Sequence, residues 1–258
     1  MKHINRNEFL STKIPLPPLE EQKRIAAILD KADALRQKRR ESIRLLDEFL
    51  RSVFLDMFGD DAEGKNYVNL EKLCFINPSK LEIKKSELEL EASFLPMSSI
   101  SEDGLLDLSK TGKVSELKKG FTYFREGDVL FAKITPSMEN GKGAIAENLL
   151  NQIGFGTTEL HVLRPKHPYK SSWLYTLLSS KKIRKKAASF MTGTAGQQRV
   201  PENFLRKLKV PPPDLEKMAI FDKIFYAVKN EKEKMKESND IFKELFNSLV
   251  QRAFRGEL

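Results

Sequence analysis

One proline-rich helix start occurs twice in the chain, as Ile14-Pro15-Leu16-Pro17-Pro18-Leu19-Glu20-Glu21-Gln22 and again as Val210-Pro211-Pro212-Pro213-Asp214-Leu215-Glu216-Lys217-Met218. The copies are 196 residues apart, since residue 15 aligns with residue 211, and the register then holds for about 45 positions without a gap. Positions of the first copy that meet identical residues include Pro15, Pro17, Leu19, Glu20, Ile28, Glu41, Ser42, Glu48, Ser52 and Phe58. A repeat of this length, split by about 150 residues of different character, predicts two equivalent long helices flanking one globular unit.

Each copy carries apolar residues at alternating spacings of three and four, the pattern of an amphipathic helix. In the first helix, expected over residues 14–59, this stripe runs from Ile25 to Met57 and is interrupted by polar residues near Arg39. The second helix, expected over residues 210–258, has the same stripe and a similarly charged middle. A helix of about 40 residues is roughly 60 Å long and cannot bury such a stripe alone. It therefore needs an antiparallel or parallel partner helix. An ordinary bundle core is one solution, but the matched interruptions favour two helices lying against each other, and we expect an antiparallel type of coiled coil.

The residues between the two helices change to the periodicity of strands. Short apolar runs bounded by Gly, Pro or Asn predict strands, and two helical patterns follow them. The expected strands cover residues 94–97, 128–134, 143–146 and 159–163, and the expected helices cover 173–180 and 181–190. We therefore predict an α+β fold, with one mixed domain over residues 60–209.

The segment before the first helix resembles the segment before the second. Asn7-Glu8-Phe9-Leu10 echoes Glu202-Asn203-Phe204-Leu205. We therefore interpret residues 1–13 as the remnant of the tail of a preceding copy of the central domain.

The positive charge of the chain is concentrated in one window. Twelve Lys and Arg residues lie between Arg164 and Lys209 with a single acid, Glu202, so this window carries +11 against +9 for the whole chain. The remainder is close to neutral, at about −2 (9 minus 11). Such a localised field suits a polyanion such as duplex DNA, although a charged surface also aids solubility.

The composition also limits the class of protein. Cys74 is the only cysteine, so neither a disulfide framework nor a thiolate metal cluster is expected. The first seven residues lack an apolar signal segment, and no window approaches 18 apolar residues. We therefore expect a cytoplasmic protein with no membrane association.

A search for catalytic residues gives little. The three histidines have no metal-ligand spacing, and neither a dinucleotide-binding glycine motif nor a phosphate-binding lysine motif is present. Glu116-Leu117-Lys118, with Asp107 upstream, could mimic the carboxylates of a metal-dependent DNA nuclease. Such triplets arise by chance in a chain with 31% charged residues, so a nuclease remains only the alternative hypothesis.

Two polar loops are better suited to recognition. Residues 133–142 leave an expected strand and return through Asn140-Gly141, and residues 192–199 lie inside the basic window. Asn, Gln and Arg side chains match the edges of adenine and guanine, whereas Lys, Ser and Thr suit phosphates. Either loop alone could be an ordinary polar turn, but together they favour DNA binding.

Four segments together resemble the specificity subunits of type I restriction-modification systems. They are Gly127 to Ser137, Gly154 to Pro165, Thr192 to Arg199 followed by Val210-Pro211-Pro212-Pro213, and the helix start at Pro18 to Gln22. The resemblance covers nearly the whole chain. Each motif alone is weak, but the combination is specific.

The resemblance implies a non-catalytic subunit that recognises double-stranded DNA. In that family, each target recognition domain reads one half of a bipartite site, and the long helices fix the spacing and dock the methyltransferase subunits. A restriction subunit joins for cleavage. S-adenosylmethionine, ATP and Mg are then expected in the partner subunits, and no cofactor is expected in this chain.

This chain has a single recognition domain with two long helices, which corresponds to a half-length form of such a subunit. We therefore expect two copies to form a homodimer through the long helices and to read an interrupted palindrome, with half-sites about one helical turn apart. The expected DNA-binding residues are Lys133, Thr135, Ser137, Asn140, Lys142, Thr157, Lys181, Lys182, Arg184, Lys185, Lys186, Thr192, Thr194, Gln197, Gln198 and Arg199.

Overall fold

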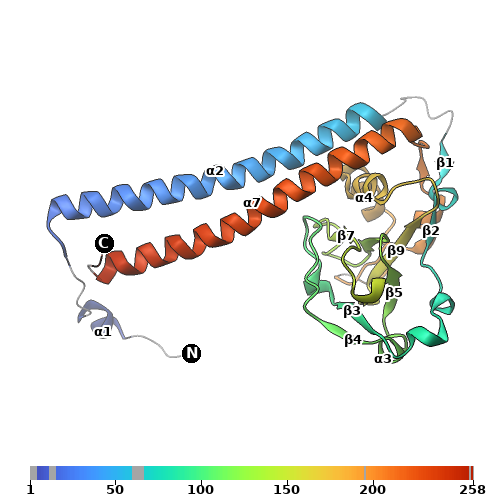
Figure 1. The fold of residues 1–258 in the computed structure, drawn as a ribbon, viewed down its shortest axis with the longest axis horizontal. Coiled ribbons are helices and arrows are strands. Elements are labelled where there is room, and N and C mark those ends of the chain that lie inside the picture. The colour runs from blue at the N-terminus through green and yellow to red at the C-terminus, as the bar shows by residue number, and fades with distance from the viewer. Residues whose placement is uncertain (1–4, 12–15, 60–66, 195, 256, 258) are drawn as a thin grey trace. The chain divides into compact units, whose positions relative to one another are not determined.

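The computed structural model describes residues 5–11, 16–59, 67–194, 196–255 and 257. The chain divides into two compact units, one formed by residues 1–50 and 227–258 and the other by residues 51–226. We refer to them as the helix unit and the mixed domain. Two long helices, α2 (Leu19–Phe58) and α7 (Leu215–Arg255), each contribute to both units (Figure 1). Both helices lie within the predicted ranges 14–59 and 210–258 but begin later, because residues 16–18 and 211–214 are not helical and Val210 lies in a strand. Residues 1–4 and 12–15, which belong to the expected tail and to the start of the first range, lie outside the described residues.

In the helix unit, α2 and α7 lie side by side and run in opposite directions (Figure 1). Lys232 of α7 donates to Asp47 of α2 at 2.5 Å, and the guanidinium of Arg36 lies 4.8 Å from the ring centroid of Phe246. From Arg36 to Asp47 the residue numbers of α2 rise, whereas those of their partners in α7 fall from Phe246 to Lys232. Only antiparallel helices give this order. The predicted antiparallel pairing is therefore confirmed.

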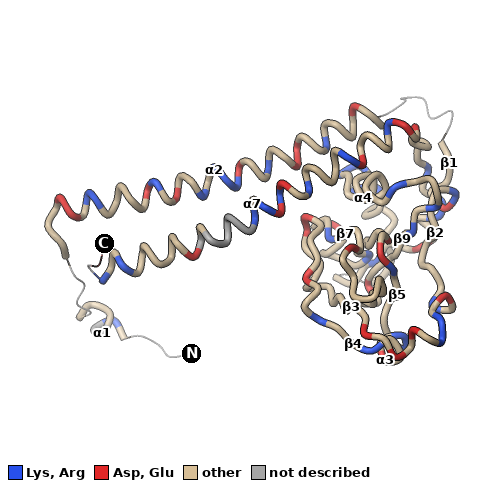
Figure 2. The backbone as a smooth tube through the Cα atoms, in the orientation of Figure 1, with Lys and Arg blue, Asp and Glu red and all other residues tan. Residues whose placement is uncertain are grey.

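The contact between these helices follows the repeat. Among the partly buried positions of α2 in this unit is a series that alternates by four and three residues: Ile25, Leu29, Ala32, Arg36, Arg39, Ile43, Leu46 and Leu50. The positions 196 residues later form the corresponding stripe of α7, in which Val228, Lys232, Met235, Phe242 and Phe246 are partly or fully buried. Since two equivalent stripes meet in opposite directions, the pair has approximate two-fold symmetry. Basic and acidic residues are interspersed along both helices (Figure 2).

The mixed domain contains two four-stranded sheets and one two-stranded sheet. Their strand orders are β2-β9-β6-β7, β4-β3-β8-β5 and β1-β10, and every pairing is antiparallel except the parallel pair β3 and β8. The strands are β1 (Val68–Asn69), β2 (Cys74–Ile76), β3 (Glu91–Leu95), β4 (Thr111–Lys113), β5 (Thr122–Arg125), β6 (Val129–Ala132), β7 (Gly143–Ile145), β8 (Ile153–Gly156), β9 (Leu160–Pro165) and β10 (Lys209–Val210). The short α-helices are α1 (Arg6–Ser11), which belongs to the helix unit, and α3 (Val114–Leu117), α4 (Ser171–Ser179), α5 (Lys181–Ala188) and α6 (Glu202–Lys207), which belong to the domain. Five single-turn 3-10 helices complete it: η1 (Leu70–Lys72), η2 (Lys80–Glu82), η3 (Lys85–Glu87), η4 (Met97–Ser99) and η5 (Leu150–Gln152).

The α+β class is confirmed, and each expected strand or helix overlaps an observed one. Of the expected strand 94–97, however, only residues 94 and 95 lie in β3, because Pro96 precedes the 3-10 helix η4, which begins at Met97. Sequence reasoning missed β1, β2, β4, β5, β8 and β10, and β8 shows what a glycine can do inside a strand. A Cβ at Gly154 would lie 2.0 Å from the ring of Phe124, so the glycine admits a large aromatic side chain beside the strand. Here glycine marks close packing within a sheet rather than a turn.

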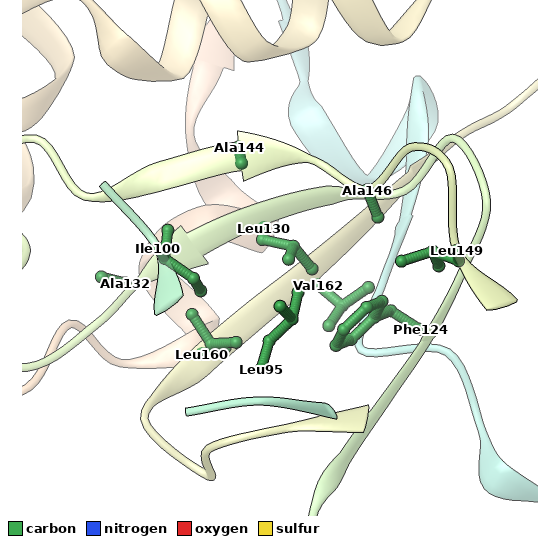
Figure 3. Close-up of a cluster of buried hydrophobic side chains, with 10 residues drawn as sticks. All are labelled: Leu95, Ile100, Phe124, Leu130, Ala132, Ala144, Ala146, Leu149, Leu160 and Val162. Carbon is green, nitrogen blue, oxygen red and sulfur yellow. The ribbon is translucent and has the colours of Figure 1, made fainter. Parts of the chain in front are cut away.

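The two larger sheets share one hydrophobic core. Leu95 and Phe124 come from one sheet, and Leu130 and Val162 come from the other (Figure 3). The ring of Phe124 and the side chains around it are almost completely buried. This contact between sheet faces fixes the strand ends from which the polar loops leave.

The ends of the long helices are part of the mixed domain. Phe54 of α2 packs against Phe221 of α7 with ring centroids 5.3 Å apart, and Phe225 packs against Tyr175 of α4 at 6.0 Å. Ser172 also donates to Asp222 at 2.5 Å. The compact unit is therefore wider than the predicted range 60–209, of which residues 60–66 lie outside the described residues.

The echo between the two short segments is also structural, because α1 and α6 are both helical. In α6, Phe204 and Leu205 are buried in the domain, whereas Phe9 and Leu10 of α1 are 70% and 68% exposed. Among the described residues, no helix is long and apolar enough to cross a membrane.

Candidate nucleic-acid interface

The two polar loops predicted from the sequence meet in the mixed domain. Residues 133–142 connect the antiparallel strands β6 and β7, and residues 192–199 follow α5. The Thr135 amide donates to the carbonyl of Gln198 at 3.0 Å, and the Val200 amide donates to the carbonyl of Lys133 at 2.8 Å. These main-chain hydrogen bonds hold the two loops edge to edge.

A third segment, the turn 157–159, joins them. The Lys133 amide donates to the carbonyl of Glu159 at 2.9 Å. The carboxylate of Glu159 receives two hydrogen bonds from Arg199, each 2.8 Å long. We call residues 133–142, 157–159 and 192–199 the polar junction.

Arg199 acts within this junction in a way that differs from its predicted role. Its Nε and Nη2 atoms bind Glu159, and its Nη1 donates to the carbonyl of Gln197 at 2.8 Å. Hydrogen bonding from Arg199 lowers the pKa of Glu159, so the carboxylate stays ionised near neutral pH. Arg199 therefore joins two loops through three of its five N–H donors.

The other predicted residues of the junction fall into two groups. The exposed side chains are Asn140, Thr192, Thr194, Gln197 and Gln198. The half-buried ones are Lys133, Thr135, Ser137, Lys142 and Thr157. Several half-buried groups hold the loops in place: Lys142 Nζ donates to the Met97 carbonyl at 3.1 Å, and Thr157 Oγ1 accepts from the Glu159 amide at 3.2 Å.

Helix α5 presents most of its predicted cations to solvent. Lys181, Lys182, Lys185 and Lys186 are exposed. Arg184 is the exception, because only 7% of it is accessible and its guanidinium donates to main-chain carbonyls. The prediction that Arg184 contacts DNA directly is therefore wrong for this structure, since the helix turns that side chain into the domain.

The basic window is less positive than its sequence suggests. Arg164 binds Asp128 at 2.7 Å and also pairs with Glu82, and Arg206 pairs with both Glu202 and Glu71. Except for Glu202, these acids lie outside the window in sequence, so counting charges along the chain could not include them. The exposed lysines of α5 remain the clearest source of positive charge for a polyanion.

A buried polar group also supports the junction. His161 of β9 donates through Nε2 to the carbonyl of Val200 at 2.8 Å, and its Nδ1 accepts from Asn77 Nδ2 at 3.2 Å. Burial lowers the pKa of His161, so the ring is neutral and can fill both roles. Asn77 also donates to Glu202 at 2.6 Å and adopts a positive φ of 51°. An Asn directly before Pro78 was the available signal, because Asn tolerates that backbone conformation.

The residues of the alternative nuclease hypothesis do not form a site. Glu116 lies in α3, where the neighbouring Leu117 is buried, and Asp107 caps the amide of Ser109 at 3.0 Å. In the part of the chain that the structure describes, three or more His, Cys, Asp or Glu residues nowhere cluster in a way that could hold a metal ion. The nuclease hypothesis thus gains no support.

Comparison with known proteins defines the class. Residues 1–45 match the family described as type I restriction modification DNA specificity domain. The chain is 36% identical over 195 residues to the specificity subunit of the type I restriction enzyme EcoEI of Escherichia coli, with 73% of this chain and 32% of the relative covered. It is 38% identical over 203 residues to the EcoAI specificity subunit of the same species, with 78% and 33% covered. The chain thus spans about a third of the length of these two relatives.

The fold is similar as well. A solved chain described in work on complex assembly and conformational transition of the type I R-M system aligns with a TM-score of 0.57 at 21% identity, covering 99% of this chain and 64% of that one. This likeness supports the fold alone. The sequence matches confirm the predicted resemblance to the specificity subunits of type I restriction-modification systems.

Proposed function

We propose that the mixed domain binds double-stranded DNA and reads one half of a bipartite target sequence. The observation that carries this proposal is the polar junction, in which three loops far apart in sequence are hydrogen-bonded into one surface. That surface exposes the amide side chains of Asn140, Gln197 and Gln198. Amides can make paired hydrogen bonds to adenine, and each good pair contributes about 1–3 kcal/mol of discrimination.

The charge of the domain supports a separate, sequence-independent contribution. Exposed lysines on α5 can neutralise phosphates and release counterions, so binding should weaken as salt rises. The rigid frame around the junction then limits which base edges the amides can reach. Phosphate contacts give affinity, and the junction gives sequence preference.

Selection from a random duplex library, using the full chain, tests the proposal. We expect enrichment of a short motif, and we expect Gln198→Ala and Asn140→Ala to change the motif without abolishing binding. Gln251→Ala, an exposed amide on α7 in the helix unit, is the matched control and should leave the motif unchanged. If no motif is enriched, or if all three variants select the same sequence as the original chain, the amides of the junction do not read DNA.

The partners follow from the family. The long antiparallel helices are proposed to dock methyltransferase subunits, and a restriction subunit would join the complex. The chain is proposed to be non-catalytic and to bind no cofactor itself, so S-adenosylmethionine, ATP and Mg would belong to those partners. Co-purification with the methyltransferase subunit tests this assembly. The methyltransferase subunit should no longer co-purify when α2 and α7 carry charge reversals on their exposed faces.

A homodimer through the long helices remains part of the proposal. Because α2 and α7 already pair within one chain, a dimer would require either a four-helix contact or an exchange of helices. Analytical ultracentrifugation at micromolar concentration, with and without the selected duplex, measures it. A monomer under both conditions would refute this part and leave DNA binding intact.

A further inference from the structure

The side chain of Arg184 is surrounded by main-chain oxygen atoms. Its Nε donates to the carbonyl of Leu178 at 3.0 Å. Its Nη1 donates to Met138 at 2.9 Å and to Lys142 at 3.3 Å, and its Nη2 donates to Gly141 and Lys142 at 3.2 and 3.3 Å. All five N–H donors of the guanidinium are therefore used, four of them on the loop between β6 and β7.

The surroundings fit this one cation closely. The guanidinium also lies over the ring of Phe131 in β6, 4.2 Å from its centroid. A Cβ at Gly143, the first residue of β7, would lie 3.1 Å from Nη2, so the glycine leaves room for the group. The groups that contact the guanidinium are main-chain carbonyls and an aromatic ring. Burial lowers the pKa of Arg184 to about 10, and the side chain is still charged at neutral pH.

Burying a cation costs free energy unless its hydrogen bonds are fully formed. Arg184 meets this requirement only if Met138, Gly141 and Lys142 hold their present positions. Conversely, those carbonyls lose their donors if the guanidinium is removed. The arginine and the loop therefore determine each other's conformation.

We propose that Arg184 is a positioning residue that sets the DNA sequence preference of the domain without touching DNA. It ties α5, which carries the exposed lysines, to the loop that carries Asn140. This inference rests on the proposed function, since the loop is assigned there to base reading. It adds that one buried side chain couples the phosphate-binding helix to the base-reading loop.

Hydrogen exchange tests the coupling without DNA. The amides of Asn140, Gly141 and Lys142 donate to carbonyls within the loop, at 2.9, 3.1 and 3.0 Å. In Arg184→Met we expect these amides to exchange at least about tenfold faster, while amides of β9 stay protected. Arg184→Lys should behave like Arg184→Met, because an ammonium has three donors and cannot span the four carbonyls. Unchanged exchange in both variants would overturn the proposal, and so would full restoration by lysine.

DNA binding provides the second measurement. The probes are a duplex carrying the sequence enriched from the random library and a scrambled duplex of equal length. For Arg184→Met and Arg184→Lys we expect the ratio of the two affinities to fall about tenfold, with the slope of affinity against salt unchanged. Lys185→Met, an exposed cation on the same helix, is the matched control: both affinities should fall together and the slope should decrease by about one.

The outcomes separate the two proposals. If Arg184 variants behave like Lys185→Met, the arginine contacts phosphate and the positioning role is wrong. If the original chain shows no sequence-dependent binding at all, the proposed function fails and the specificity role fails with it. The exchange measurement still decides in that case whether Arg184 fixes the loop. Tryptophan fluorescence of Trp173, which is buried in the same domain, confirms that each variant is folded.

Discussion

The contact between the long helices and the core of the mixed domain differ in how completely they exclude water. Between the helices, within the helix unit, the contact positions of α2 are only partly buried, and charged side chains such as Arg36 and Lys232 stand among them. In the domain core, Leu130 and Phe124 are 1% and 0% exposed and belong to one cluster of buried apolar side chains (Figure 3). Two paired helices can cover only one side of each other, whereas two packed sheets enclose their facing side chains. The domain should therefore derive its stability from packing, and the helix unit more from its length and charge pattern.

The largest expected effect comes from making one chemical change in three places. Leu130→Ala in the core should lower the free energy of unfolding by about 3 kcal/mol, because it leaves a cavity. Leu46→Ala between the helices should cost about 1 kcal/mol, since that side chain is only half-buried. Leu81→Ala, at a position that is 89% exposed, is the control and should cost less than about 0.5 kcal/mol.

Two optical probes can separate the units. Trp173 is the only tryptophan and lies in the domain, while far-UV circular dichroism is dominated by the long helices. We expect Leu130→Ala to shift the denaturant midpoint seen by fluorescence, and Leu46→Ala to shift mainly the one seen by circular dichroism. The two regions would not differ in stability as described if both substitutions lowered the free energy of unfolding equally. The same would follow if each substitution shifted the fluorescence and circular dichroism midpoints by the same amount.

A smaller effect is expected when a charge is removed from the helix contact. The Arg36 Nε atom is buried and has no hydrogen-bond partner, although the guanidinium lies over Phe246 and 3.4 Å from Asp33. Arg36→Leu should therefore raise the free energy of unfolding of the helix unit by about 1 kcal/mol. Lys38→Leu, at an exposed position of the same helix, is the control. A loss of stability in Arg36→Leu would mean that its cation–π contact outweighs the cost of burial.

The ion pair between the helices should contribute less again. Lys232 is 14% exposed and Asp47 is 37% exposed, so solvent screens much of their attraction. A double-mutant cycle with Asp47→Ala and Lys232→Ala should give a coupling of about 0.5–1 kcal/mol that decreases with added salt. A coupling that is independent of salt would indicate that the pair is shielded from solvent like a group of the domain core.

The smallest effect is a difference in pH dependence between the two units. Burial lowers the folded-state pKa of His161, so its contribution to stability is complete above the unfolded pKa, near 6.5, and is lost as pH falls toward the folded pKa. Acidification from pH 7.5 to 5.5 should therefore destabilise the fluorescence-monitored domain of the original chain more than that of His161→Asn. The helix transition should show no such difference between the two proteins. An equal slope in both proteins for the domain would contradict the assignment of His161 as a neutral, buried group.

Much of this architecture could be predicted from local sequence patterns. The alternation of three and four residues fixes which face of α2 and α7 is apolar, and it does so twice because the pattern repeats. The strands β6, β7 and β9 were also predictable, since each is a short apolar run with turn residues at its ends. The two polar loops could be found for the same reason, because they follow directly from strands.

The direction of individual side chains was less predictable. Lys185 and Arg184 are neighbours in a basic run, yet one is exposed and the other donates five hydrogen bonds inside the domain. Arg199 likewise looked available for DNA but binds Glu159, a residue 40 positions away. Partners of this kind are brought together by the sheets, so neither charge counts nor helical spacing can identify them.

The sequence by itself therefore determined the two long helices, their pairing face, the α+β class and the resemblance to a known family, because these depend on periodicity and on motifs within short windows. The tertiary structure alone decided that the three polar loops form one surface, that part of the apparent basic charge is neutralised, and that Arg184 holds a loop in place. The physical reason is that hydrogen bonds, ion pairs and burial act between residues that are close in space, and the folding of the sheets makes them neighbours.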